Sequence, residues 1–245
     1  MLMRGYREKF FPPKSNCTIW RYFDFTKFVS LLESGKLVFP RADKFEDPYE
    51  GALSQAGVRL LRDPETSPRL PPEAVETLVE HSPWMQKAIF MSCWYVGDHE
   101  SAAMWKLYLQ SSEGVAIRTD YNTLAAVLED APQNAVISLV EYIDYEKIPI
   151  PLHNMLYKYL HKRLSFSHEN ELRAIIWSWD HINKSQIPSD STSVAVPVPL
   201  DRLLHAIHVA PTAKPWFGEL VEQVTRRYGL NTPVIRSNLY DRPTY

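Results

Sequence analysis

One continuous stretch of 33 residues constrains the fold more than any other part of the chain. It reads IWRYFDFTKFVSLLESGKLVFPRADKFEDPYEG and runs from Ile19 to Gly51. Its short aromatic start predicts a strand, and the apolar residues at helical spacing after Asp24 predict a helix that this aspartate caps. Gly35 suits the left-handed position that ends a helix. The stretch therefore predicts strand, helix and strand, followed by a charged turn.

The remaining chain mixes strands and helices without a regular alternation between them. Strands are predicted where apolar and β-branched residues run or alternate, at 87–94, 114–119, 135–144, 171–177, 194–198, 204–209 and 233–236. Helices are predicted where the apolar spacing is close to 3.6 residues, at 73–81, 99–110, 120–128, 151–163 and 216–228. This order predicts an α+β fold with a mixed, mainly antiparallel or split sheet and helices packed around it.

Length and composition favour a single domain. A chain of 245 residues, 45% hydrophobic and 23% charged, can bury a sizeable core. We expect this core to extend from about residue 19 to residue 237, with a proline-rich loop insertion near 62–72. The net charge of -2 gives no reason to expect non-specific binding to nucleic acid or anionic membranes. The oligomeric state is left open by the sequence.

The sequence predicts a cytoplasmic protein without a membrane span. Its two cysteines, Cys17 and Cys93, lie far apart and form no disulfide framework, which suits a reducing compartment. The first residues have no apolar core long enough for a signal peptide. No stretch approaches the roughly 20 apolar residues of a membrane span.

Common phosphate-binding and metal-binding motifs are absent from the sequence. The chain contains no G-x-x-x-x-G-K-[ST], no G-x-G-x-x-G and no H-E-x-x-H. Two adjacent pairs, His99-Glu100 and His168-Glu169, could meet in space as metal ligands, but surface hydrogen bonding is the simpler interpretation. We therefore expect no metal cofactor.

Charged side chains gather where the predicted strand 171–177 begins, in the run Glu169-Asn-Glu171-Leu172-Arg173. In an extended chain the two glutamates and the arginine share one face, and Leu172 takes the other, buried face. One interpretation is a surface ladder of ion pairs. The other is a carboxylate that points into a cleft and is oriented by its arginine neighbour.

An acidic turn follows the strand that leads to Arg41. Pro48 is expected to fix this turn, and Glu50 is expected to pair with a basic group, either Arg41 or Arg173.

A basic run lies near the end of the predicted helix 151–163. Its members are Lys158, His161, Lys162 and Arg163. A solvated helix end, where cations are favoured, is the simplest interpretation, and contact with nucleic acid is the alternative.

Four blocks in a fixed order resemble the bacterial domain-of-unknown-function family numbered 2971. They are WRYFDFTKFVSLLESGKLVFPRADKFEDPYEG, then SCW followed by ESAAMWKLY, then EGVAIRTDY, then FSHENELRAI. The resemblance covers most of the chain, from about Trp20 to Ser237. The family name implies no established chemistry.

A second resemblance is to the R–S–ExE pattern of the ADP-ribosyltransferases. Arg21 lies on the first strand, Ser92 on a middle strand, and Glu169 and Glu171 form ExE before a late strand. This resemblance implies a split-sheet fold that grips NAD. In that fold the arginine holds phosphate or ribose, the serine braces the site, and the second glutamate hydrogen-bonds the nicotinamide ribose.

The resemblance implies further residues that bind NAD. A bidentate arginine suits a pyrophosphate, and aromatic rings suit stacking on nicotinamide. The implied cofactor-binding residues are Arg21, Tyr22, Arg41, Trp94, Trp105 and Arg173. We expect one cleft between the segment 21–41 and the segment 169–173, with Arg21, Ser92 and Glu171 converging on it. We also expect Glu171, rather than Glu169, to carry catalysis, because it adjoins an apolar strand that holds it rigid.

The resemblance therefore implies an NAD-dependent ADP-ribosyltransferase or NAD glycohydrolase, a bacterial toxin or phage-defence effector with a protein or nucleic acid as acceptor. A non-catalytic module that binds a nucleotide or nucleic acid in the same cleft is the alternative. A metal-dependent nuclease is the third interpretation.

Overall fold

The computed structural model describes residues 10–63, 65, 71–80, 85–109, 111–133, 135–178 and 190–243, with the side chain of Glu80 left out. These residues group into two compact units, each assembled from separate stretches of the chain. The first unit comprises Met1–Pro12, Phe39–Ser92 and Val136–Val194, and the second comprises Pro13–Val38, Cys93–Ala135 and Ala195–Tyr245. The expectation of a single domain concerns both units together and stays a prediction.

Antiparallel strands form the centre of the second unit. Their order is β11 (Val234–Arg236), β10 (Ala206–Val209), β4 (Gly114–Asp120), β1 (Thr18–Asp24) and the later part of β3 (Ile89–Val96). The pairs β1–β3, β1–β4 and β10–β4 are antiparallel, and β10–β11 is parallel. A mainly antiparallel sheet combined with helices confirms the predicted α+β class.

Helices of the second unit pack on these strands through apolar faces. They are α2 (Phe25–Ser34), α6 (Ala102–Tyr108), α7 (Tyr121–Glu129), α8 (Leu200–Leu203) and α9 (Pro215–Arg227). Phe28 of α2 and Phe217 of α9 are fully buried, and the ring of Phe217 meets that of Phe25 edge-on, 5.1 Å between centroids. Gly35 ends α2 at φ 61°, and its N–H donates to the carbonyl of Leu31, as predicted for a helix C-terminus.

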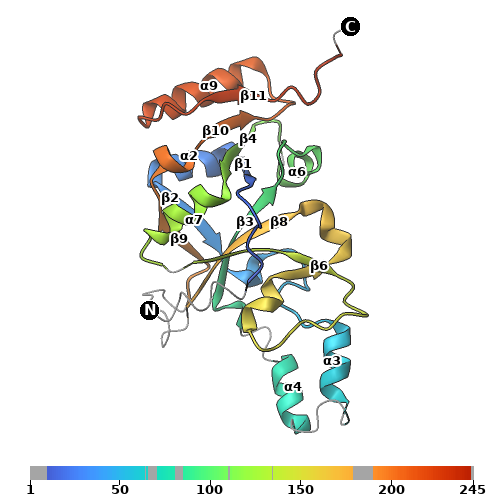
Figure 1. The fold of residues 1–245 in the computed structure, drawn as a ribbon. Helices are drawn as coiled ribbons and strands as arrows, with labels where there is room; N and C mark the ends of the chain where they lie inside the picture. Colours follow the sequence, from blue (N-terminus) through green and yellow to red (C-terminus); the bar gives the residue numbers. More distant parts are fainter. Residues whose placement is uncertain are drawn as a thin grey trace. The chain divides into compact units, whose positions relative to one another are not determined.

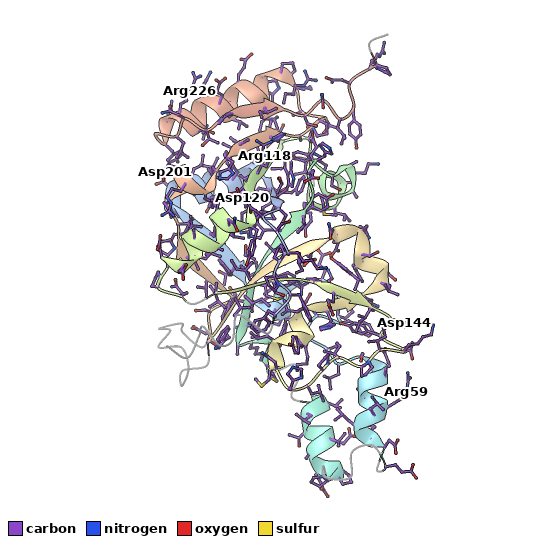
Figure 2. All side chains as sticks on the ribbon, in the orientation of Figure 1. Arg59, Arg118, Asp120, Asp144, Asp201 and Arg226 are labelled. Carbon is purple, nitrogen blue, oxygen red and sulfur yellow. The ribbon has the colours of Figure 1, made fainter. Side chains whose placement is uncertain are left out.

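Aspartates precede helices α2 and α7, but only one of them forms a cap hydrogen bond. Asp24 precedes α2 but forms no cap hydrogen bond, and it pairs with Lys27 at 2.9 Å instead, so the predicted cap is wrong. Asp120, labelled in Figure 2, does cap α7: its Oδ1 accepts the N–H of Thr123 at 2.8 Å.

The first unit contains the earlier part of β3 next to β8 (Glu171–Trp177), with β5 (Val136–Leu139) beyond it. β5 and β8 are antiparallel, and β6 (Glu141–Ile143) pairs in parallel with β7 (His161–Arg163) as a separate small sheet. Short 3-10 turns surround the strands: η1 (Ala42–Lys44), η2 (Met155–Tyr159) and η3 (Leu164–Glu169). A further small sheet joins β2 (Lys36–Pro40) to β9 (Ser193–Pro197).

Two helices lie side by side in the first unit, α3 (Gln55–Arg62) and α4 (Pro72–Glu80) (Figure 1). The guanidinium of Arg62 bridges both carboxylate oxygens of Glu76 and so ties the helices together. Arg59, labelled in Figure 2, extends from α3 to the carboxylate of Glu146, at 3.0 Å. The predicted loop insertion near 62–72 lies mostly outside the described residues, but its first and last residues belong to α3 and α4.

The structure corrects the prediction of one long strand at 135–144. This segment forms β5 and then β6, which belong to different sheets. Val140 separates them, and its N–H donates to the carbonyl of Glu171, whereas the N–H of Glu141 donates to Leu160. The chain therefore changes partners between adjacent residues, which alternation of side chains along a sequence does not reveal.

The predicted helix at 151–163 is also wrong. The segment forms the 3-10 turn η2 and then strand β7. Asn154 starts η2, and its side chain accepts the N–H of Leu156 at 3.0 Å, while β7 is held by its pairing with β6. Tertiary hydrogen bonding overrides the helical spacing of the apolar residues here.

Candidate active site

The candidate site is built at the start of β8, in the first unit. All seven residues of β8 are buried, so the expectation of a single buried face is corrected: the strand is covered on both faces. Burial on both faces means that any charged side chain on β8 needs partners inside the protein. Glu171 and Arg173 are such residues.

Arg173 has no exposed surface, and its guanidinium donates to several acceptors. Its terminal nitrogens contact both oxygens of Glu50, at 2.6 and 2.9 Å. Its Nε donates to Glu171 Oε2 at 2.6 Å, and Nη1 also donates to the carbonyl of Tyr159 at 2.7 Å. The prediction that Glu50 pairs with Arg41 or Arg173 is confirmed, and the partner is Arg173.

A second cation, Lys162 of β7, joins the two glutamates of the ExE run. Its ammonium donates to Glu171 Oε1 at 2.9 Å and to Glu169 Oε2. Each oxygen of Glu171 therefore has its own cation, Lys162 on one side and Arg173 on the other. The side chain of Glu169 is more accessible, at 15% exposure against 5% for Glu171.

The backbone between the two glutamates turns sharply. Glu169 ends η3, so it is not in the extended conformation that the sequence analysis assumed. Asn170 follows at φ 38° and ψ 60°, in the left-handed region, and it is the one non-glycine residue with positive φ in the described chain. Asparagine tolerates this region better than most residues. The turn lets both carboxylates reach one ammonium although Glu169 lies outside the strand.

Carboxylates outnumber the cations that contact them among the described residues of this site. Three carboxylates (Glu50, Glu169 and Glu171) contact two cations, Arg173 and Lys162. Burial, the hydrogen bond with Glu171 and the charge of Glu171 raise the pKa of Glu169 to about 7. Burial also raises the pKa of Glu50, against the opposing charge of Arg173, and Glu169 is a group of this cluster whose pKa lies near neutrality.

Glu171 behaves in the opposite way. Burial alone would raise its pKa, but the charge of Arg173, the hydrogen bond from Glu169 and the charge of Lys162 lower the pKa well below its ordinary value. The pKa of Lys162 is raised, because the carboxylates outweigh the effect of its burial. The neighbouring charges therefore shift the two carboxyls in opposite directions: the pKa of Glu171 is lowered and that of Glu169 is raised.

Aromatic and polar groups complete the surroundings of the cluster. The hydroxyl of Tyr142 accepts the N–H of Glu171 at 2.9 Å. The ring of Phe166 lies 4.7 Å from the Lys162 ammonium and 5.1 Å from the guanidinium of Arg163, and Arg163 pairs with Asp47 at 2.9 Å. These contacts fix η3 and β7 against each other.

Two other predicted site residues lie in the same unit with different partners. Arg41 contacts both oxygens of Asp43, at 2.7 and 3.0 Å, and donates to the carbonyl of Ser191. It is buried and ties residues 191–192 to η1. Ser92 is fully buried on β3. A phosphate-binding role for Arg41 would require the contacts with Asp43 to open.

Arg21 and Trp94 belong to the second unit, where they face each other. The Arg21 guanidinium lies 5.8 Å from the Trp94 ring and 5.2 Å from the Phe23 ring, and it donates to the carbonyl of Val38 at 2.8 Å. Burial lowers the pKa of Arg21 to about 10. The predicted convergence of Arg21 with Ser92 and Glu171 involves both units and stays a prediction.

Tyr22 and Trp105 form a separate aromatic contact in the second unit. Their rings meet edge-on, with centroids 4.9 Å apart. The Tyr22 hydroxyl accepts the N–H of Ser101, and the Trp105 indole donates to Glu100 at 2.6 Å. Because Arg21 and Tyr22 are consecutive on β1, their side chains leave opposite faces of the strand. The predicted NAD-binding residues of this unit therefore form two groups, Arg21 with Trp94 and Tyr22 with Trp105.

Lys162 is the site residue that the sequence analysis missed. The basic run at 158–163 was expected at a solvated helix end, whereas Lys158, His161 and Lys162 are buried. One signal was available: two adjacent carboxylates at a buried strand need more than the single cation Arg173. Which residue supplies the second cation depends on the pairing of β7 with β6, which no local pattern encodes.

The described residues contain no group of three histidine, cysteine, aspartate or glutamate side chains arranged to hold a metal ion. In the same part of the chain, none of the helices combines the length and the apolar character that crossing a membrane requires.

The chain matches no protein-family model and no curated protein sequence, so the resemblance to family 2971 gains no support. Among solved structures it is similar to DarT of Thermus sp. 2.9. The DarT complex with NAD+ has a TM-score of 0.42 and 9% identity over 93% of this chain and 97% of that chain. The complex with ADP-ribosylated single-stranded DNA has a TM-score of 0.42 and 10% identity over 94% and 97%. Likenesses at this level define neither the fold nor the activity of this chain.

Proposed function

We propose that this protein breaks the bond between nicotinamide and ribose in NAD and passes ADP-ribose to an acceptor. The observation that carries the proposal is the pair Glu169 and Glu171 on one buried lysine, in a cluster where the described carboxylates outnumber the described cations. The order of Arg21, Ser92 and the two glutamates along the sequence, which is similar to the R–S–ExE pattern, supports the same chemistry.

The charge of the cluster suits this reaction. When the C–N bond breaks, nicotinamide leaves with the bonding electron pair, and positive charge develops on the ribose. A fixed carboxylate beside the ribose stabilises that charge in the transition state. The acceptor nucleophile, water or a group on a protein or nucleic acid, then forms the new bond to the ribose and releases a proton.

The contacts support different roles for the two glutamates. Both oxygens of Glu171 are occupied by cations, and Glu171 is the less accessible of the two. Glu169 shares the Lys162 ammonium with Glu171 and lies at the more accessible position. We assign contact with the ribose to Glu169 and the positioning of Glu169 to Glu171. This assignment differs from the expectation that Glu171 acts directly, which stays a prediction.

Purified protein incubated with NAD tests the proposal through the release of nicotinamide, followed by chromatography. Glu169→Gln keeps the shape of the side chain and removes its charge, so we expect release to fall about 100-fold to 1000-fold. Glu171→Gln should also lower release. Glu76→Gln, at an exposed carboxylate on α4, is the control and should leave the rate unchanged.

The rate should also depend on pH. Because Glu169 must be ionised to stabilise positive charge and its pKa lies at about 7, we expect release to rise as the pH increases through 7. Folded parent protein that binds NAD but releases no nicotinamide would contradict the enzyme and favour a non-catalytic nucleotide-binding module.

A further inference from the structure

We propose that Lys162 is a positioning residue that holds Glu169 and Glu171 together and keeps Glu169 available in its ionised form. This inference rests on the proposed function for its consequence in catalysis, but its structural basis is independent of NAD. Lys162 touches no position that we assign to the substrate, and it acts through Glu169.

The position of Lys162 supports this role. Its side chain is 8% exposed and lies between the two carboxylates, with the Phe166 ring 4.7 Å from the ammonium. Lysine normally keeps its ammonium in water, and burying the charge is costly unless partners compensate it. Here the partners are the two acidic residues of the ExE run, and they come from η3 and β8, two elements that the lysine connects.

Several charged and titratable groups lie around Glu169 in the described part of the chain. Lys162 on β7 is the cation in direct contact with it, and Arg173 on β8 acts mainly on Glu171 and Glu50. Glu171 on β8 repels it, and Tyr142 on β6 carries no charge near neutral pH, because burial and the neighbouring glutamates raise its pKa. His168 precedes Glu169 on η3 and is exposed. Among these groups, Lys162 is the one whose loss would directly favour protonation of Glu169.

Substitution of Lys162 therefore has a specific signature. Lys162→Met removes the ammonium and keeps an unbranched apolar chain, so the two carboxylates face each other without a shared cation. We expect the pH at half-maximal nicotinamide release to rise by about one unit or more, the effect of losing a neighbouring opposite charge. Lys162→Arg keeps the charge and should restore the profile of the parent to a large extent.

The decisive measurement does not use NAD. Carbon-13 NMR of labelled glutamate follows the titration of Glu169 directly, and the signal is assigned by its loss in Glu169→Gln. The midpoint should move to higher pH in Lys162→Met and stay close to the parent value in Lys162→Arg. Lys147→Met is the control, since Lys147 is 81% exposed and pairs with Asp144.

The outcomes separate the two proposals. A shifted midpoint without any nicotinamide release would refute the proposed enzyme and leave the role of Lys162 in place. An unchanged midpoint in folded Lys162→Met overturns the inference, whatever the activity.

If Lys162→Met does not fold, the double variant Lys162→Met with Glu169→Gln provides the test. Removing one of the two repelling carboxylates should recover stability. A double variant no more stable than Lys162→Met would refute the role of Lys162.

Discussion

Replacing Arg173 by methionine should destabilise the protein more than any other single change at the site. Arg173→Met removes a fully buried guanidinium that contacts Glu50 through two nitrogens and Glu171 through a third. Methionine fills much of the same volume, so the loss of packing is small. Two buried carboxylates remain: among the described residues, Glu50 then contacts no cation and Glu171 contacts Lys162 alone.

The expected loss of stability in Arg173→Met follows from the burial of Glu50 and Glu171. Removing one member of a buried ion pair typically costs about 3–5 kcal/mol, because the other charge stays buried without compensation. The carbonyl of Tyr159 also loses a donor at 2.7 Å, which adds about 1–3 kcal/mol for an unsatisfied buried acceptor. The total is a large fraction of the roughly 5–15 kcal/mol that stabilises a typical domain.

Urea unfolding followed by circular dichroism measures this loss. The matched control is Arg62→Met, because Arg62 also makes a two-nitrogen contact with a glutamate but is 54% exposed. Exposed pairs contribute about 0–1 kcal/mol, so Arg62→Met should shift the unfolding midpoint little. The double variant Glu50→Gln with Arg173→Met should be more stable than Arg173→Met alone, since one unpaired charge is gone.

The difference in unfolding free energy between the parent and Arg173→Met should also become smaller at low pH. The lowered pKa of Glu171 means that its ionised form stabilises the folded protein above the ordinary pKa of a glutamate, and this contribution is lost as the pH falls toward the folded-state pKa. Without Arg173 the carboxylate of Glu171 takes up a proton more readily. The unfolding free energies of the parent and the variant should therefore approach each other in acid. A deficit below about 1 kcal/mol at neutral pH, the size of an exposed pair, would refute the account of this cluster.

Substitutions at three further positions test local features of the fold by thermal or urea unfolding. Gly51→Ala should be strongly destabilising, because Gly51 has φ 70° and an added Cβ would overlap the ring of Tyr159; a stable Gly51→Ala would contradict the close approach. Asn170→Ala should cost about 1–2 kcal/mol for the left-handed backbone, whereas Asn170→Gly should cost less, and the reverse order would disprove this conformation. Asp120→Ala should cost about 1 kcal/mol through the lost cap at Thr123, and an unchanged midpoint would show that the cap contributes nothing.

The sequence by itself determined the elements whose signals are local. Strand β1 and helix α2 with its terminal Gly35 form in the order predicted for the stretch 19–51, and β8 and α9 lie within one residue of their predicted bounds. Apolar spacing, a glycine that tolerates positive φ and a run of β-branched residues act within a few residues of each other. The same local reasoning placed Glu50 in an acidic turn and named Arg173 as one of its two candidate partners.

Tertiary structure alone decided the arrangement of the site. Residues 151–163 have helical spacing, yet pairing with β6 makes the end of this segment a strand and carries Lys162 inward. The contact of Glu50 with Arg173 spans 123 positions along the chain, so its geometry depends on the packing of strands that are distant in sequence. The protonation of Glu169 depends in turn on that packing, because burial and the neighbouring charges of Glu171 and Lys162 set its pKa. A sequence specifies which groups can ionise, and only their positions in the folded protein specify which of them do.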